Sequence, residues 1–238
     1  MKKVNRKYTS LFFDLDNTLW DFNTNSYHAM HVVFIKLGLS AFDVDFDHFF
    51  KVYSKYNYSL WNLYRNRGIT KKELTKKRFQ DTFDELGITG LDAEQMNNKY
   101  LNEMPNQEKL VDGAPEILNY LKKKNYQLFI ITNGFKEVQY KKLQNAGIDT
   151  YFDKIFISEE VKSPKPSKEI FEYAITSSNA SKAKSLMIGD DWETDILGAL
   201  KFGIDSVYFL NSSKEEQKIH SGQKIYIITN LYDLMEIL

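Results

Sequence analysis

Hydrophobic positions follow different periods in different regions of the chain. The stretch from residue 11 to residue 19 begins as a short apolar, aromatic-rich run, which is typical of a strand buried in a parallel sheet. This run ends in two carboxylates, Asp14 and Asp16. From about residue 23 to residue 104, apolar side chains recur every three or four positions, which predicts helices. Beyond residue 110, short apolar runs and helical segments alternate.

The region from residue 20 to residue 108 has no convincing strand pattern. Capping residues and glycine or proline stops bound its helical segments. The expected helices cover residues 23–37, 46–65, 70–86 and 92–104. We therefore predict an all-helical insert, residues 20–108, in a core domain formed by residues 1–19 and 109–238.

The rest of the chain predicts an α/β core with a Rossmann-like parallel sheet. Further strands are expected at residues 127–132, 154–158, 185–190, 206–210 and 224–229. Helices are expected between them at residues 113–124, 135–145, 168–177 and 194–202, and a short one follows Asn230. Strands that alternate with single helices at these lengths indicate βαβ units.

Composition excludes several classes of function. The chain of 238 residues is 42% hydrophobic, enough for a packed core, and its 32 basic residues balance 32 acidic ones. This balance argues against a nucleic-acid polymer or a membrane as partner. The absence of cysteine excludes disulfides, thiolate metal sites and cysteine nucleophiles. The basic N-terminus is followed by too short an apolar run for a signal peptide, so we expect a cytoplasmic protein that binds a small molecule.

Polar side chains follow the predicted strands at their carboxyl ends. They are Asp14 and Asp16; Thr132, Asn133 and Gly134; Lys165; and Asp190, Asp191 and Asp195. Because the carboxyl ends of parallel strands share one edge of a sheet, we expect these residues to meet there. Taken singly, each group has a structural explanation as a turn, an exposed loop lysine or a helix-capping cluster.

Taken together, these residues favour phosphoryl transfer. Asp14 and Asp16 lie two positions apart and so share a strand face, where like charges repel unless a cation lies between them or one carboxyl keeps its proton. Oxygen ligands of this kind select Mg²⁺. The Thr132 hydroxyl and nearby backbone N–H groups can hold phosphate oxygens, and Lys165 adds positive charge where the transition state is negative.

The motifs resemble those of the haloacid dehalogenase superfamily. Residues 14–18 (DLDNT) match its first motif, residues 132–134 (TNG) its second, residues 165–166 (KP) its third, and residues 189–195 its fourth. The helical insert is similar to the type-one cap domain of that superfamily.

The resemblance implies a role for each site residue. Asp14 would be the nucleophile that forms an aspartyl phosphate, and Asp16 the general acid and base. Mg²⁺ would be held by Asp14, the backbone carbonyl of Asp16 and Asp190, with Asp195 outside the direct ligands. The expected phosphate-binding residues are Thr132, Asn133 and Lys165. An aspartate at position 16 favours phosphatases over true dehalogenases.

Within the superfamily, Trp20, Phe22 and the segments 60–61 and 70–79 are similar to bacterial house-cleaning pyrimidine 5′-nucleotidases. The expected activity is therefore hydrolysis of nucleoside 5′-monophosphates such as dUMP, UMP or dTMP by a monomer or weak homodimer. Three alternatives remain open. They are a sugar phosphomutase of the β-phosphoglucomutase type, a phosphatase for sugar phosphates or phosphoglycolate, and a non-catalytic phosphate-binding protein.

Overall fold

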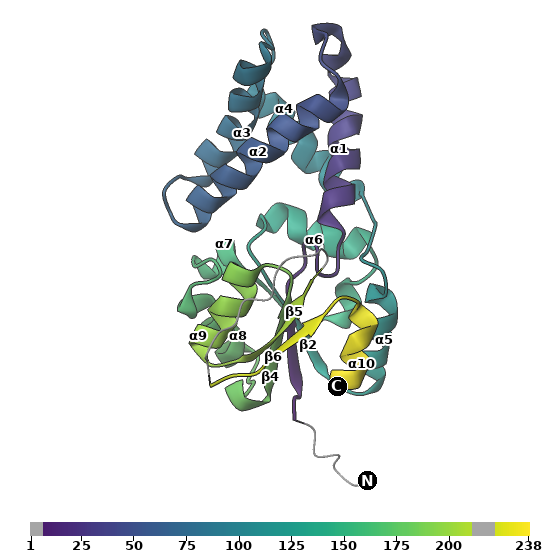
Figure 1. The fold of residues 1–238 in the computed structure, drawn as a ribbon, viewed down its shortest axis with the longest axis vertical. Helices are drawn as coiled ribbons and strands as arrows, with labels where there is room; N and C mark the ends of the chain where they lie inside the picture. Colours follow the sequence, from purple (N-terminus) through teal and green to yellow (C-terminus); the bar gives the residue numbers. More distant parts are fainter. Residues whose placement is uncertain (1–6, 211–221) are drawn as a thin grey trace. The chain divides into compact units, whose positions relative to one another are not determined.

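The computed structural model describes residues 7–210 and 222–238, and contacts within the chain group it into two compact units. One unit comprises Met1–Phe22 and Lys109–Leu238, and the other is the intervening segment Asn23–Glu108. The first unit contains the predicted sheet and the second is helical (Figure 1).

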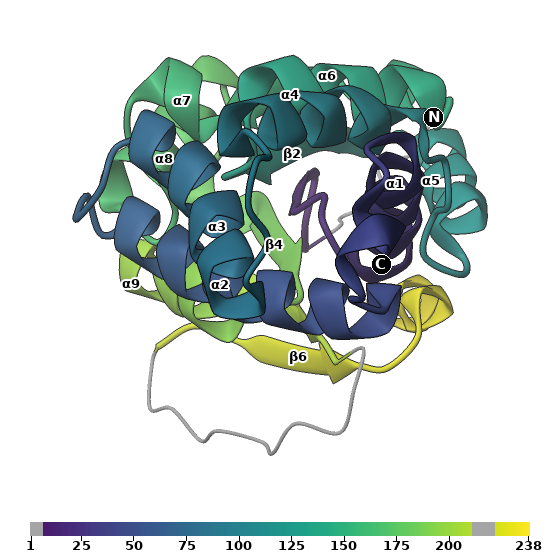
Figure 2. The same ribbon diagram turned by 90° about the horizontal axis from the view of Figure 1, so that it is seen from above.

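The sheet of the first unit is parallel throughout. Its strands are β1 (Ser10–Phe13), β2 (Gln127–Thr132), β3 (Lys154–Ile157), β4 (Ser185–Gly189), β5 (Asp205–Phe209) and β6 (Ile225–Ile228). They lie in the order β3-β2-β1-β4-β5-β6, with β6 at one edge (Figure 2). Strands β2 and β3 follow β1 on one side of it, and β4, β5 and β6 follow on the other, so β1 lies between β2 and β4. This confirms the predicted α/β fold with a Rossmann-like parallel sheet.

Helices cover both faces of the sheet. They are α5 (Ala114–Lys123), α6 (Lys136–Asn145), α7 (Ser158–Val161), α8 (Lys168–Ser177), α9 (Gly198–Phe202) and α10 (Leu234–Ile237). Helices α8 and α9 lie on one side of the strands, and α5 and α10 lie on the other (Figure 1).

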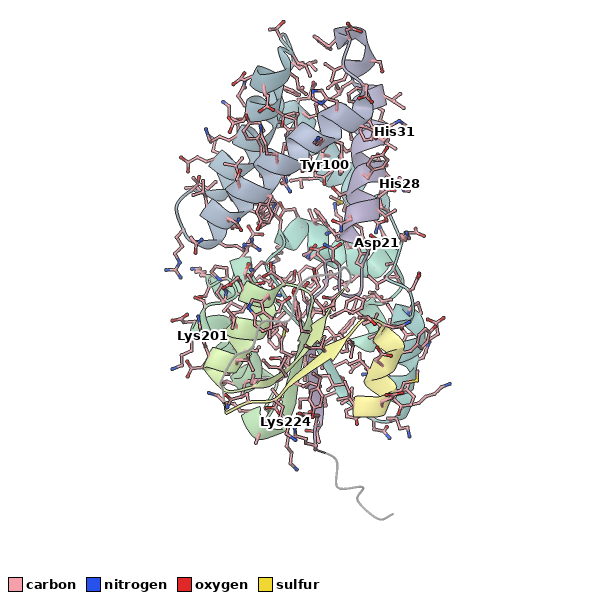
Figure 3. All side chains as sticks on the ribbon, in the orientation of Figure 1. Asp21, His28, His31, Tyr100, Lys201 and Lys224 are labelled. Atoms are coloured by element: carbon pink, nitrogen blue, oxygen red, sulfur yellow. The ribbon has the colours of Figure 1, made fainter. Side chains whose placement is uncertain are left out.

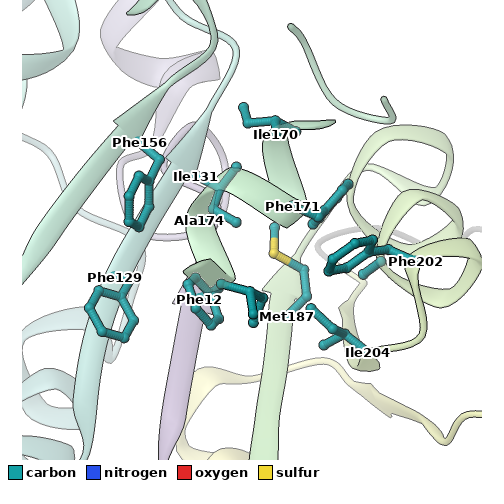
Figure 4. Close-up of a cluster of buried hydrophobic side chains, with 12 residues drawn as sticks. Phe12, Phe129, Ile131, Phe156, Ile170, Phe171, Ala174, Met187, Phe202 and Ile204 are labelled. Carbon is teal, nitrogen blue, oxygen red and sulfur yellow. The ribbon is translucent and has the colours of Figure 1, made fainter. Parts of the chain in front are cut away.

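A buried cluster joins α8 and α9 to the sheet (Figure 4). From the strands, Phe12 and Phe129 contribute stacked rings with centroids 4.8 Å apart. From the helices, Phe171 and Phe202 contribute a second stacked pair with centroids 6.0 Å apart. All four side chains are buried. The alternation of strand side chains explains why Phe12 and Phe129, which are paired in register across β1 and β2, face the same helices.

The segment after β4 departs from the predicted helix 194–202. A π-helical turn occupies Trp192–Leu197 and only Gly198–Phe202 is α-helical. The Asp191 carboxylate accepts hydrogen bonds from the backbone N–H groups of Glu193 and Thr194, which explains the early start of the helix. The Ile196 N–H also donates to the Asp191 carbonyl at 3.4 Å, which is the five-residue spacing of a π turn. Ser158, predicted as the last residue of a strand, instead begins α7, and β3 ends at Ile157.

The helical unit is built from α1 (Phe22–Lys36), α2 (Phe46–Arg65), α3 (Lys71–Leu86) and α4 (Ala93–Glu103). Throughout residues 23–108, all of which are described, the structure contains no strand. Side-chain caps from Asp45, Thr70 and Asp92 begin three of these helices. Among the described residues, no helix combines the length and apolarity needed to cross a membrane.

Aromatic side chains form much of the interior of the helical unit. The rings of Tyr53 and Phe79 stack with centroids 5.0 Å apart, and Tyr100, labelled in Figure 3, meets Tyr53 edge to face. The Tyr100 hydroxyl is hydrogen-bonded to the Ser26 hydroxyl at 2.7 Å. These aromatic residues are therefore core side chains, as their helical spacing predicts.

Replacing Phe129 by alanine should destabilise the sheet unit, because it removes a buried ring from the centre of the cluster. We expect a loss of about 3–5 kcal/mol in the free energy of unfolding, measured by denaturant titration. Tyr58, whose side chain is 70% exposed, supplies the control: Tyr58→Ala should change stability by less than about 0.5 kcal/mol. A loss below about 1 kcal/mol for Phe129→Ala would contradict this packing.

Candidate active site

The carboxyl ends of β1 and β4 bring the first and fourth motifs together. The Asp14 N–H donates to the Ile188 carbonyl at 2.9 Å, which continues the β1–β4 pairing one residue beyond the strand. This registration places Asp14 beside the end of β4, which Asp190 follows. The Thr18 hydroxyl donates to Asp190 Oδ1 at 3.2 Å and so fixes the loop after β1 to the loop after β4.

Lys165 joins the third motif to this pair of strands. Its Nζ donates to Asp14 Oδ1 and to Asp195 Oδ1, each at 2.6 Å. The lysine is 2% exposed and Asp195 is completely buried. Burial opposes the charged form of Lys165, but the two carboxylates more than offset this and raise the pKa of the ammonium group above its usual value.

Asn133 holds the backbone of Lys165. Its Nδ2 donates to the Lys165 carbonyl at 3.0 Å, and its Oδ1 accepts from the Lys165 N–H at 2.8 Å. Sequence reasoning assigned Asn133 to phosphate binding. The structure shows its side-chain amide hydrogen-bonded to the Lys165 backbone, and a phosphate contact from Asn133 stays a prediction.

Gly189 makes room for Asp195. A Cβ atom at position 189 would lie 2.3 Å from Asp195 Oδ2, which is too close for two non-bonded atoms. Only glycine fits here without displacing Asp195. The same oxygen accepts a hydrogen bond from the Asp191 N–H at 3.1 Å. Both carboxylate oxygens of Asp195 are therefore bonded within the protein, one to Lys165 and one to the backbone.

Three carboxylates form a group that could hold a metal ion. One oxygen each from Asp14, Asp190 and Asp195 lies within 4.8 Å of the others. Among the described residues, Lys165 supplies the ammonium group that contacts them, so the group carries an excess of negative charge that a divalent cation would neutralise. The Asp16 side chain is not part of this group in the described chain, and the ligand predicted there is its backbone carbonyl.

Burial of the carboxylates changes their proton affinity. It raises the pKa of Asp14 well above its usual range, although the charge of Lys165 acts in the opposite direction. Burial, followed by repulsion from Asp195 and Asp191, raises the pKa of Asp190 to about 7. The pKa of Asp195 is also raised by burial, again against the charge of Lys165. A cation would reverse these shifts, because it stabilises the ionised carboxylates.

Asp16 is held by two residues of α6 that sequence reasoning did not identify. Lys142 Nζ donates to Asp16 Oδ1 at 2.7 Å, and Gln139 Nε2 donates to Asp16 Oδ2 at 2.9 Å. Both residues are buried. The only signal in the sequence is their spacing of three positions inside a predicted helix, which places them on one helix face.

The Thr132 hydroxyl, at the end of β2, is oriented by its neighbours. It accepts hydrogen bonds from the Gly134 N–H at 3.2 Å and from Gln139 Nε2 at 2.7 Å. With both lone pairs of the oxygen occupied, the hydroxyl hydrogen is left to donate to a ligand. The phosphate-binding role of Thr132 stays a prediction from the sequence.

The chain matches the family model of the haloacid dehalogenase-like hydrolases over residues 11–209. It therefore belongs to this hydrolase family. The match begins within β1, ends at the last residue of β5 and includes all four motifs, and it identifies the chain as an enzyme.

Two nucleotidases are similar over nearly their whole length. The pyrimidine 5′-nucleotidase YjjG of Escherichia coli is 32% identical over 98% of this chain and 98% of its own. The pyrimidine 5′-nucleotidase PynA of Streptococcus pneumoniae is 30% identical over 97% of this chain and 95% of its own.

A sugar-phosphate phosphatase and a solved structure are also similar. The glyceraldehyde 3-phosphate phosphatase of Pyrococcus furiosus is 30% identical over 98% of this chain and 94% of its own. The crystal structure of the HAD-hydrolase YfnB from Bacillus subtilis, bound to magnesium, superposes with a TM-score of 0.87 at 29% identity. That match covers 98% of this chain and 99% of YfnB.

Replacing Asp190 by asparagine should stabilise the metal-free protein in a pH-dependent way. The folded-state pKa of about 7 exceeds the ordinary value of an aspartate, so the folded protein binds more protons and loses stability as pH rises from about 4 to about 7. Asparagine removes this penalty. In a chelator, we expect the Tm of Asp190→Asn to exceed that of the parent by a few degrees at about pH 8 and by much less at about pH 4.5.

Exposed Asp112 supplies the control, since Asp112→Asn should shift the Tm little at either pH. A Tm gain for Asp190→Asn that is the same at both pH values would contradict the raised pKa of Asp190.

Proposed function

We propose that the protein is a magnesium-dependent phosphatase for small phosphate monoesters, and that its substrates are pyrimidine nucleoside 5′-monophosphates. The observation that carries the chemistry is the contact of the Lys165 ammonium with Asp14 in a buried cluster that also contains Asp190. The similarity to two pyrimidine 5′-nucleotidases over nearly the whole chain supports the substrate class.

In the first step, an Asp14 carboxylate oxygen attacks phosphorus, the bond from phosphorus to the ester oxygen breaks, and an aspartyl phosphate forms. Asp16, in its protonated form, gives its proton to the departing alcohol. Lys165 Nζ, 2.6 Å from Asp14 Oδ1, provides positive charge next to the transferred group. The Thr132 hydroxyl donates to a phosphate oxygen.

In the second step, water attacks phosphorus and the bond from phosphorus to the Asp14 oxygen breaks. Asp16, now a carboxylate, takes a proton from the attacking water. Inorganic phosphate leaves, and Asp14 and Asp16 return to their starting states.

The donor set fits Mg²⁺, because it consists of hard carboxylate oxygens whose negative charge exceeds that of their one lysine partner. Asp14 and Asp190 are the side chains that would hold the ion. Asp195, with both oxygens already hydrogen-bonded, would support the site from outside. When bound, the ion supplies charge that shields the phosphate from the attacking carboxylate.

A second substrate class has specific support. The glyceraldehyde 3-phosphate phosphatase of Pyrococcus furiosus is similar over nearly the whole chain, so phosphates of small sugars are the main alternative. A cytoplasmic location and a monomeric or weakly dimeric state stay predictions from the sequence.

Replacing Asp14 by asparagine should abolish turnover, because the amide oxygen is a poor nucleophile. We expect kcat to fall by at least about 1,000-fold in a phosphate-release assay with Mg²⁺. A cooperative unfolding transition in the variant would show that the fold is intact. Substantial turnover by the folded variant would rule out the aspartyl phosphate.

A panel of phosphate monoesters assayed with Mg²⁺ should identify the substrate class. We expect UMP, dUMP or dTMP to give the highest kcat/KM, by about 10-fold or more over purine nucleotides and triose phosphates. Higher kcat/KM for triose phosphates would favour the alternative. Interconversion of sugar phosphates without release of inorganic phosphate would indicate a mutase instead.

A further inference from the structure

Helix α6 directs two buried polar side chains at Asp16. Gln139 is fully buried and Lys142 is 2% exposed. They lie three positions apart, so they share a helix face. That two neighbouring positions on a buried face carry an amide and an ammonium group, rather than apolar side chains, calls for an explanation.

The contacts account for both oxygens of the Asp16 carboxylate. Oδ1 accepts a hydrogen bond from Lys142 Nζ at 2.7 Å, and Oδ2 accepts one from Gln139 Nε2 at 2.9 Å. The same amide nitrogen donates to the Thr132 hydroxyl at 2.7 Å. Gln139 therefore connects the proposed acid and base to the proposed phosphate-binding hydroxyl.

Trp20 fixes the ammonium group from another direction. Lys142 Nζ lies 4.1 Å from the centroid of the Trp20 ring, a distance at which the ring face attracts a cation. Trp20 is itself completely buried. The lysine is thus held by a carboxylate and an aromatic ring.

Stability alone does not explain this arrangement. Removing an ammonium group from water is costly, and well-packed apolar side chains often replace a buried ion pair without loss of stability. The Asp16 side chain remains 27% exposed while Lys142 is almost inaccessible, so the buried cation serves a carboxylate that can still meet a ligand or water.

We propose that Lys142 and Gln139 are positioning residues that hold Asp16 as an oriented carboxylate for hydrolysis of the aspartyl phosphate. This inference rests on the proposed function. In that step the water oxygen bonds to phosphorus, the phosphorus bond to Asp14 breaks, and one water proton passes to Asp16. Hydrogen bonds to Oδ1 and Oδ2 fix both oxygens of the carboxylate and so set the direction from which Asp16 meets the attacking water.

The two half-reactions should therefore respond differently to loss of Lys142. With p-nitrophenyl phosphate, whose leaving group needs little protonation, formation of the aspartyl phosphate should stay fast in Lys142→Met while its hydrolysis slows. We expect a kcat about 10-fold lower than that of the parent. Rapid mixing should show a burst of about one p-nitrophenol for each active site.

Matched variants separate positioning from folding. Lys142→Arg keeps the charge and should recover most of the activity. Lys141→Met, which changes the exposed neighbouring lysine on α6, should behave like the parent. Gln139→Met removes the other bond to Asp16 and should also give a burst, together with a higher KM because Thr132 loses its amide partner.

The outcomes distinguish this inference from the proposed function. Asp16→Asn, which lacks the base altogether, should show the burst in full. If Asp16→Asn shows it and folded Lys142→Met and Gln139→Met lose activity without a burst, the inference is wrong and the proposed function stands. If no variant accumulates phosphoenzyme and Asp14→Asn remains active, the proposed function fails first.

Discussion

The site depends on one ammonium group between two buried carboxylates. Lys165 donates to Asp14, which follows the first strand, and to Asp195, which lies in the π-helical turn after β4. Neither carboxylate could remain ionised in the interior without such a partner. The rest of the site supports this contact: Asn133 holds the backbone of the lysine, and Gly189 leaves the space that Asp195 fills. One cation thus connects three segments that are distant in the sequence.

The parallel sheet makes this contact possible, because it brings the loops that carry these side chains to one edge. The carboxylates that meet there explain why the site could hold a metal ion. Because β1 lies between β2 and β4, the loops that follow these strands meet at one edge. Burial first, and repulsion between the gathered carboxylates second, raises the pKa values of Asp14 and Asp190, and the excess of negative charge favours a divalent cation. Asp16 lies in a different local environment, with its own cation from α6. The two aspartates of the first motif therefore lie in different surroundings, which supports the different roles proposed for them.

The sequence was sufficient to predict the sheet and the gathering of its polar residues. Apolar runs identified the strands, and the carboxyl-end rule placed Asp14, Asp190 and Lys165 at one edge. It could not show that the Asn133 side chain turns toward the lysine backbone, because that contact depends on a loop conformation. It also could not single out Gln139 and Lys142, since polar residues inside a helix usually face solvent and only the packed structure shows that these do not.

A crystal structure of the protein with Mg²⁺ and beryllium trifluoride, a mimic of the transferred phosphoryl group, tests the central claim most directly. The account predicts that the beryllium atom is bonded to a carboxylate oxygen of Asp14. Lys165 and the Thr132 hydroxyl should contact its fluorine atoms, and the metal ion should contact Asp14 and Asp190. Beryllium trifluoride bound to another carboxylate, or a metal ion bound away from Asp14 and Asp190, would contradict it.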